Sequence, residues 1–292
     1  MKPLKVIIWA LFILPAACGD NENQADAYGN FEAIEVIVSS ETQGVIRQFG
    51  EMEGARMEKG RIAVVIDTTQ LQLKKEQLLS GMASLRAKMQ TLDAQVRVSH
   101  VQMENLKREE RRVENLLEGG AATSKQMDDI SGQIDLLKAQ IEATESQKSS
   151  ILAEKQTLEI QVRQVEDQIA KCSVRNPVGG IMLTKYREQG EIAAPGQPLY
   201  KVANLDQLIL RAYISGNQLS SVKTGAEVRV RFDTPEGMDQ ITGVVNWVSP
   251  QAEFTPKIIQ TRDERVNLVY AIKVVVPNSG RLKIGMPGEV IF

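Results

Sequence analysis

Residues 44–66 read GVIRQFGEMEGARMEKGRIAVVI, and residues 180–202 read GIMLTKYREQGEIAAPGQPLYKV. Three glycines of the first stretch recur in the second after the same shift of 136 positions: Gly44, Gly54 and Gly60 become Gly180, Gly190 and Gly196. Three equal spacings are improbable by chance, so the stretches predict two halves of one module that meet in space. The roughly hundred residues between them have a helical period, and we expect them to project from that module as an insertion.

Both halves have the pattern of short β-strands. Apolar side chains alternate with polar ones at Ile34, Val36 and Val38, and residues 62–66 form a run rich in β-branched side chains. The predicted halves, residues 31–67 and 172–205, resemble a biotinyl/lipoyl-like β-sandwich. In carrier proteins of that fold a lysine on an exposed hairpin holds the cofactor. Here the insertion enters at that hairpin, and neither Asp-Lys-Ala nor Met-Lys-Met occurs, so we expect no cofactor and no carrier role.

The insertion, predicted to span residues 68–171, carries two runs of apolar side chains at alternating steps of three and four. The first run is Leu71, Leu78, Met82, Leu85, Met89, Leu92, Val96, Met103, Leu106, Val113 and Leu117; the second includes Met127, Ile130, Ile134, Leu137, Ile141, Ile151, Leu158, Val162, Val165 and Ile169. This spacing is typical of a coiled-coil seam. Polar residues occupy some seam positions, and a Ser99–Thr144 layer is expected if the chain reverses near residue 121. Gly119-Gly120 predicts that reversal, so the two arms should form an antiparallel hairpin of about 70 Å.

The predicted turn has a recognisable sequence on both sides. Thr123 fits a helix N-cap, with Gln126 completing a capping box. The segment from Arg112 to Thr123 resembles the hairpin tip of HlyD-type periplasmic adaptors, the membrane fusion proteins. In that family an Arg, a Leu four residues later and a Ser seven after that engage a TolC-like outer-membrane channel. The resemblance implies docking through Arg112, Leu116 and Thr123, around a tip made of Gly119, Gly120, Ala121 and Ala122. The alternative is a solvated arginine, a leucine beside the seam and a simple cap.

The remaining residues, 206–292, predict a small β-barrel, because short strand-like runs alternate with Gly and Pro. Residues 225–228 and 285–288 resemble the barrel of the same adaptors. The stretch from Phe254 to Arg265 is similar to a segment of adaptors paired with ABC-type exporters, although it could be an ordinary exposed loop with charge pairs. The expected fold class is therefore α+β: a split biotinyl/lipoyl-like β-sandwich, an inserted antiparallel coiled-coil hairpin, and a following β-barrel.

The N-terminus has the features of an export signal. Lys2 and Lys5 precede nine apolar residues, a run too short to span a bilayer, and small residues lead to Cys18. Residues 1–17 are predicted to be a signal peptide, and 18–30 a flexible tether. The residues before Cys18 resemble a bacterial lipobox, which implies lipid attachment at Cys18 and a periplasmic protein anchored to the inner membrane. An ordinary signal cleavage that releases a soluble protein is the alternative.

Composition narrows the remaining possibilities. With 35 Lys and Arg against 37 Asp and Glu, the net charge of −2 does not favour nucleic acid. Two cysteines and one histidine exclude a disulfide framework and most zinc sites, so no metal is expected. No acid–base group stands out, which favours a protein that is not an enzyme.

The resemblance implies an adaptor between an inner-membrane transporter, most simply an ABC permease with its ATPase, and a TolC-like channel. It also implies a ring of copies, six in number. The alternatives are a coiled-coil scaffold lipoprotein without a role in transport, and a lipoyl- or biotin-type carrier.

Overall fold

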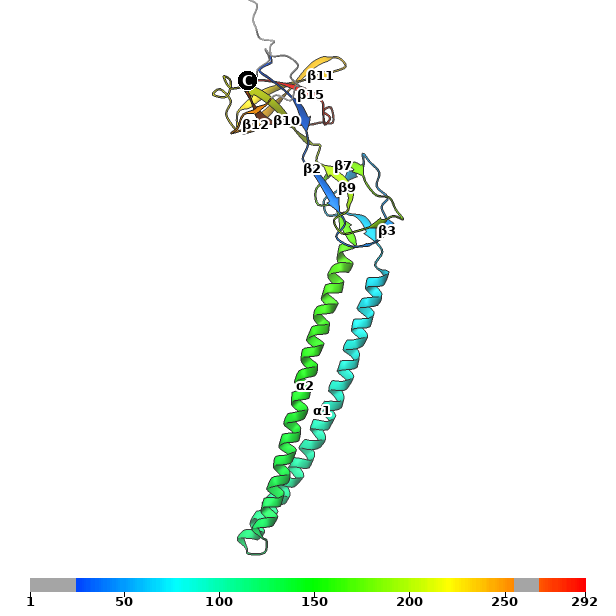
Figure 1. The fold of residues 1–292 in the computed structure, drawn as a ribbon, viewed down its shortest axis with the longest axis vertical. Coiled ribbons are helices and arrows are strands. Elements are labelled where there is room, and N and C mark those ends of the chain that lie inside the picture. The colour runs from blue at the N-terminus through cyan, green and yellow to red at the C-terminus, as the bar shows by residue number, and fades with distance from the viewer. Residues whose placement is uncertain (1–24, 255–267) are drawn as a thin grey trace, which may run out of the picture. The chain divides into compact units, whose positions relative to one another are not determined.

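The computed structural model describes residues 25–254 and 268–292. The chain forms two compact units. One contains Val36–Val202, the split sandwich and its inserted hairpin, and the other combines the described residues up to Glu35 with those described from Ala203 onward. Figure 1 shows the two long helices lying side by side within the first unit.

The sandwich interleaves the two halves of the repeat in both of its sheets. One sheet has the order β2 (Glu35–Ser39), β9 (Pro198–Ala203), β7 (Gly180–Lys185) and β4 (Arg56–Met57); the other has the order β6 (Ser173–Arg175), β5 (Ile62–Ile66), β3 (Gly44–Gln48) and β8 (Ile192–Ala193). Each sheet therefore takes two strands from each half. The predicted meeting of two distant stretches in one module is confirmed.

The repeat also governs the sandwich core and its turns. Positions related by the repeat are buried together, namely Ile46 with Met182, Val64 with Tyr200, and Ile66 with Val202. The backbone amide of Gly54 donates to the Met182 carbonyl at 2.8 Å, and Gly190 donates to Ile46 at 2.9 Å, which is the same bond with the halves exchanged. Both glycines have positive φ, 85° and 94°, a backbone region that other residues rarely adopt. Each half thus supplies a turn that hydrogen-bonds to the other half.

Helices α1 (Thr69–Glu118) and α2 (Ser124–Lys171) form the hairpin. The seam predicted from the sequence contains their most buried side chains: Leu78, Leu85, Ser99 and Val113 on α1, with Ile134, Val162 and Val165 on α2. Three polar contacts cross between the arms, and their partners lie symmetrically about the Gly120–Ala121 bond: Lys75 with Glu166, Asp93 with Lys148, and Glu110 with Ser131. The arms are therefore antiparallel and level with each other.

The polar layer expected within the seam involves Ser99 and Thr144. Ser99 is buried at 7% exposure. The Thr144 hydroxyl, however, donates to the Gln140 carbonyl of its own helix at 2.8 Å. A threonine within a helix commonly satisfies its hydroxyl in this way. The Thr144 hydroxyl is thus satisfied within α2, and a polar layer formed by Ser99 and Thr144 stays a prediction.

The second unit is a β-barrel built from both ends of the described chain. Its strands are β1 (Ala27–Glu32), β10 (Gln207–Ser215), β11 (Glu227–Thr234), β12 (Gly237–Val248), β13 (Glu253–Phe254), β14 (Leu268–Pro277) and β15 (Pro287–Ile291). They form a seven-stranded sheet in the order β10-β1-β15-β11-β12-β14-β13, which closes through pairing of β10 with β14. The predicted fold class is confirmed, with the difference that the barrel also includes residues that precede the sandwich.

That difference corrects two sequence-based assignments. The sequence predicts that Phe31 starts the sandwich and that residues 18–30 form a tether, but Ala27–Glu32 form β1, which pairs with β10 and β15. Phe31 is fully buried in the barrel core, where its ring meets Phe232 edge-on at 6.5 Å. A Cβ at Gly29 would lie only 1.9 Å from the Arg211 carbonyl oxygen. Strand β1 therefore depends on close approach to a distant strand, which local patterning does not reveal.

Candidate functional site: the two ends of the hairpin

The turn between the arms is a Schellman motif, which ends α1 sharply. Gly120 has a φ of 70° and donates to the Leu117 carbonyl at 3.0 Å. Ala121 donates to the Leu116 carbonyl at 2.8 Å. These two bonds define the motif, and glycine suits its left-handed position because other residues are strained there. The tip is therefore a short, hydrogen-bonded turn rather than an open loop.

On the other side of the turn, Thr123 begins α2 as the sequence predicts. Its Oγ1 accepts from the Gln126 backbone amide at 3.3 Å, and the Gln126 side chain accepts from the Thr123 amide at 2.8 Å. The Thr123 hydroxyl also donates to Gln126 Oε1 at 3.1 Å. The capping box is complete, and it already engages the hydroxyl that the resemblance assigned to docking.

Arg112 and Leu116 lie one turn apart on α1, so they share one face of the helix. The Leu116 side chain is 44% exposed, whereas Val113, a seam residue, is 8% exposed. The Arg112 side chain is 71% exposed, and its Nη1 donates to Glu109 Oε2 at 2.7 Å. This ion pair stays within one helical turn. An apolar side chain and a guanidinium with further donors are thus available at the tip.

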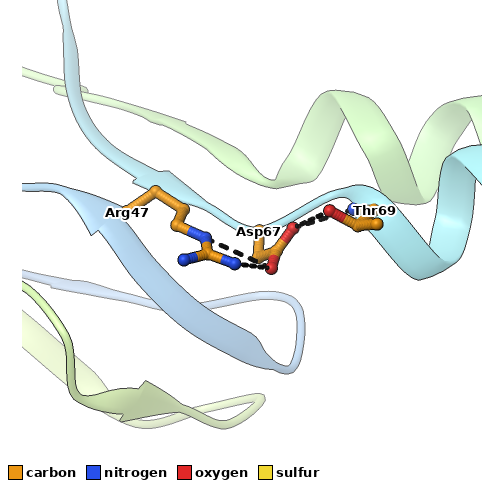
Figure 2. Close-up of polar contacts among 3 residues, drawn as sticks. All are labelled: Arg47, Asp67 and Thr69. Carbon is orange, nitrogen blue, oxygen red and sulfur yellow. Dashed lines mark hydrogen bonds and ion pairs between the residues drawn. The ribbon is translucent and has the colours of Figure 1, made fainter.

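The opposite end of the hairpin, its root, is held by a second arginine–carboxylate pair (Figure 2). Asp67 follows strand β5, and its Oδ1 accepts from the Thr69 amide at 2.9 Å and from the Thr69 hydroxyl at 2.6 Å. Its Oδ2 accepts from Arg47 on strand β3, at 2.5 Å from Nη2 and 3.2 Å from Nε. Asp67 therefore caps the start of α1 and ties it to a neighbouring strand.

These contacts shift the titration of Asp67. Hydrogen bonds from the Thr69 hydroxyl and amide, followed by those from Arg47, lower the pKa of its carboxyl to about 2. A carboxylate that accepts several hydrogen bonds is stabilised in its charged form, which is the physical cause of the shift. Asp67 is not among the residues that the sequence predicts to be functional. An Asp directly after a buried strand and two residues before a Thr that starts a helix is the signal that could have revealed it.

Lys185 of the sandwich makes its polar contacts within the fold. Lys185, one of the two lysines of the second half, has a side chain that is 11% exposed; its Nζ lies 2.7 Å from Glu188 and donates to the Phe49 carbonyl at 3.2 Å. Such a lysine is held as part of the fold. Among the described residues, no group of three or more His, Cys, Asp or Glu side chains could hold a metal ion. The described helices include none that is long and apolar enough to cross a membrane.

The sequence and the fold were compared with those of known proteins. No protein-family model matches the chain. A UPF0194 membrane protein from Acidithiobacillus ferridurans is 31% identical over 144 residues, which cover 49% of this chain and 41% of that protein. The chain therefore aligns with less than half of this relative's length.

Two solved structures share the fold over most of the chain. MacA from Actinobacillus actinomycetemcomitans matches 91% of this chain and 78% of its own, with 17% identity and a TM-score of 0.55. The membrane fusion protein Spr0693 from Streptococcus pneumoniae R6 matches 90% of this chain and 96% of its own, with 13% identity and a TM-score of 0.55. The chain thus has the fold of a membrane fusion protein. Cys18 and residues 255–267, which carry two of the sequence-based interpretations, lie outside the described residues.

Proposed function

We propose that this protein is an adaptor subunit that links an inner-membrane transporter to an outer-membrane channel, and that the tip of its hairpin docks the channel. The observation that carries the proposal is the exposure of Arg112 and Leu116 on one helix face, next to the turn. Their identity and spacing match the docking motif of HlyD-type adaptors. The split sandwich and the fold of a membrane fusion protein support the same reading.

The three predicted docking residues contribute in different ways. Arg112 offers forked hydrogen bonds to carbonyls or carboxylates of a partner helix, and Leu116 offers apolar area beside it. Thr123 fixes the direction in which α2 leaves the turn, because its hydroxyl belongs to the capping box. The turn has no bulky side chain, so a partner can approach its backbone closely. Its residues are Gly119, Gly120, Ala121 and Ala122.

The wider assembly is part of the proposal. Six copies form a ring, Cys18 carries a lipid that anchors the protein to the periplasmic side of the inner membrane, and the transporter is an ABC permease with its ATPase. The similarity of the segment from Phe254 to Arg265 to adaptors of ABC exporters supports the last point. The adaptor itself performs no covalent chemistry, and the transporter supplies the energy.

Export in cells that contain the transporter and the channel tests the proposal. Arg112→Asp should reduce export to background, because a reversed charge at a docking surface costs a few kcal/mol of binding. Arg111→Asp is a matched control, since it makes the same change one residue away, on a different face of the exposed helix. Full export by Arg112→Asp, or equal loss by Arg111→Asp, would refute docking through the tip.

Co-purification separates the proposal from a scaffold lipoprotein. An adaptor should retain both its transporter and the channel, and Arg112→Asp should lose the channel while keeping the transporter. A scaffold that only spaces two surfaces would retain neither.

A further inference from the structure

The outer surface of the barrel has a hollow of about 740 Å³ over strands β10, β1, β15 and β11 and the start of β12. Side chains alternate along β1, and Ala27 and Phe31 point into the core, so Tyr28 points outward. Tyr28 pairs with Tyr213 on β10 and with Glu289 on β15, and paired residues share one face of a sheet. The hollow therefore lies outside the barrel core, and its volume is in the range of small-molecule sites.

Two glycines explain why the sheet is depressed at this place. Gly29 on β1 pairs with Gly288 on β15, and both line the hollow. A Cβ at Gly288 would lie 2.9 Å from the Phe31 ring and 3.0 Å from the Leu210 side chain, closer than Cβ atoms normally approach other atoms. The two strands therefore lie nearer to the barrel core than residues with side chains would allow, and this leaves space on their outer side.

Aromatic and apolar side chains flank the depression. Tyr213 and Tyr28 lie on one side, on β10 and β1, and Met238 lies on the other side, on β12. Tyr28 is 57% exposed and Met238 is 52% exposed. The Tyr213 ring already has the Arg211 guanidinium 5.9 Å from its centre, whereas the Tyr28 ring contacts no other ring and no cation among the described residues. Because the face of a tyrosine ring attracts cations, Tyr28 offers a place for a positively charged ligand.

The charged side chains that line the hollow are one cation and two carboxylates. Arg231 Nη2 donates to Glu289 Oε2 at 2.6 Å, and the two side chains are only 16% and 26% exposed, so their charges compensate each other. Asp233 lies two residues further along β11, on the same outward face, and is exposed. Its carboxylate forms no hydrogen bond or ion pair within the part of the chain that the structure describes. Asp233 therefore gives the hollow a local negative charge.

We propose that this hollow binds an organic cation, a molecule with an aromatic or other apolar body and one positive charge. The body packs against Tyr28 and Met238, and the charge is attracted by Asp233. Tyr28 and Asp233 lie two strands apart, which is about 10 Å, a distance that a molecule of two or three rings spans. A neutral molecule would desolvate the Asp233 carboxylate without compensation, and an anion would be repelled by it. The site belongs to the barrel alone and does not depend on the proposed docking of the hairpin tip.

Calorimetric titration of the purified full chain with two matched ions tests the site. Tetraphenylphosphonium and tetraphenylborate have the same shape and opposite charge, and the cation should bind saturably and more tightly than the anion. Asp233→Asn should weaken binding of the cation several-fold. Glu236→Gln is the matched control, because it removes the same charge in the same β-hairpin but outside the lining of the hollow, and it should change nothing. No saturable binding of the cation, equal or tighter binding of the anion, or equal weakening by both variants would overturn the proposal.

Substitutions of Tyr28 and a charge reversal at Asp233 sharpen the test. Tyr28→Leu keeps an apolar side chain but removes the ring, and it should weaken binding of tetraphenylphosphonium by about two- to five-fold, the contribution of an exposed cation–π contact. Tyr28→Phe keeps the ring and should bind like the wild type. Asp233→Lys should reverse the preference, so that tetraphenylborate binds more tightly than the cation. Equal affinity of Tyr28→Leu and Tyr28→Phe, or a retained preference for the cation in Asp233→Lys, would also refute the site. None of these readouts involves the hairpin, so this site and channel docking can fail independently.

Discussion

The two ends of the hairpin each carry an arginine–carboxylate pair, and the pairs are connected differently. At the root, Arg47 and Asp67 come from neighbouring strands and hold the first turn of α1. At the tip, Arg112 and Glu109 belong to the same helical turn and join nothing else. A pair that spans two elements fixes their geometry, whereas a pair within one turn of an exposed helix contributes little to stability. The root is therefore built to hold the hairpin, and the tip leaves its groups available to a partner.

Truncation of leucines at the two ends should show the largest contrast. Leu78→Ala removes a buried seam residue that packs with Val162 and Val165. We expect a loss of about 2–3 kcal/mol, because the cavity cannot be filled by neighbours on a two-helix seam. Leu116→Ala, at the tip, should change stability by no more than about 0.5 kcal/mol. Urea unfolding followed by helical circular dichroism measures both, and similar losses would contradict the contrast.

Substitution of Thr123 should have an intermediate effect on stability, because the capping box at Thr123 stabilises the start of α2 at the tip. Thr123→Ala removes the cap acceptor for the Gln126 amide and should cost about 1 kcal/mol. Thr123→Ser keeps the hydroxyl and should be nearly neutral in both stability and export. If Thr123→Ala lost export while unfolding at the wild-type urea concentration, the hydroxyl would contact the channel directly and the capping role would be secondary.

The sequence predicted the features that depend on local spacing. The seam follows from the repeat of three and four, and the turn follows from Gly119-Gly120, because both are encoded within a few residues. The interleaved sandwich was predictable for a different reason, since an internal repeat reports distant contacts by its equal spacing. The predicted capping box at Thr123 likewise needs only residues three apart.

The sequence did not predict features that depend on contacts between distant segments outside the internal repeat. Strand β1 is recognisable only from its pairing with β10 and β15, which lie far along the chain. Arg47 and Asp67 are 20 residues apart, and only the fold makes them neighbours.

Acid should loosen the root by a small but specific amount. The pKa of Asp67 is lowered to about 2, so its ionised form is favoured in the folded protein. The resulting stabilisation is complete above the unfolded-state pKa, near 4, and is lost as the pH falls toward 2. The stability difference between the wild type and Asp67→Asn should therefore be constant at neutral pH and shrink across that window.

Thr69→Val provides the second comparison. This variant removes the hydroxyl that contributes most to the shift, so it should raise the pKa of Asp67 and move the window toward higher pH. Unfolding of the three chains by urea between pH 2 and pH 7 measures the effect. A difference between wild type and Asp67→Asn that persisted unchanged to pH 2 would mean that the carboxylate does not hold the root through its charge, and the contrast with the tip would lose its electrostatic basis.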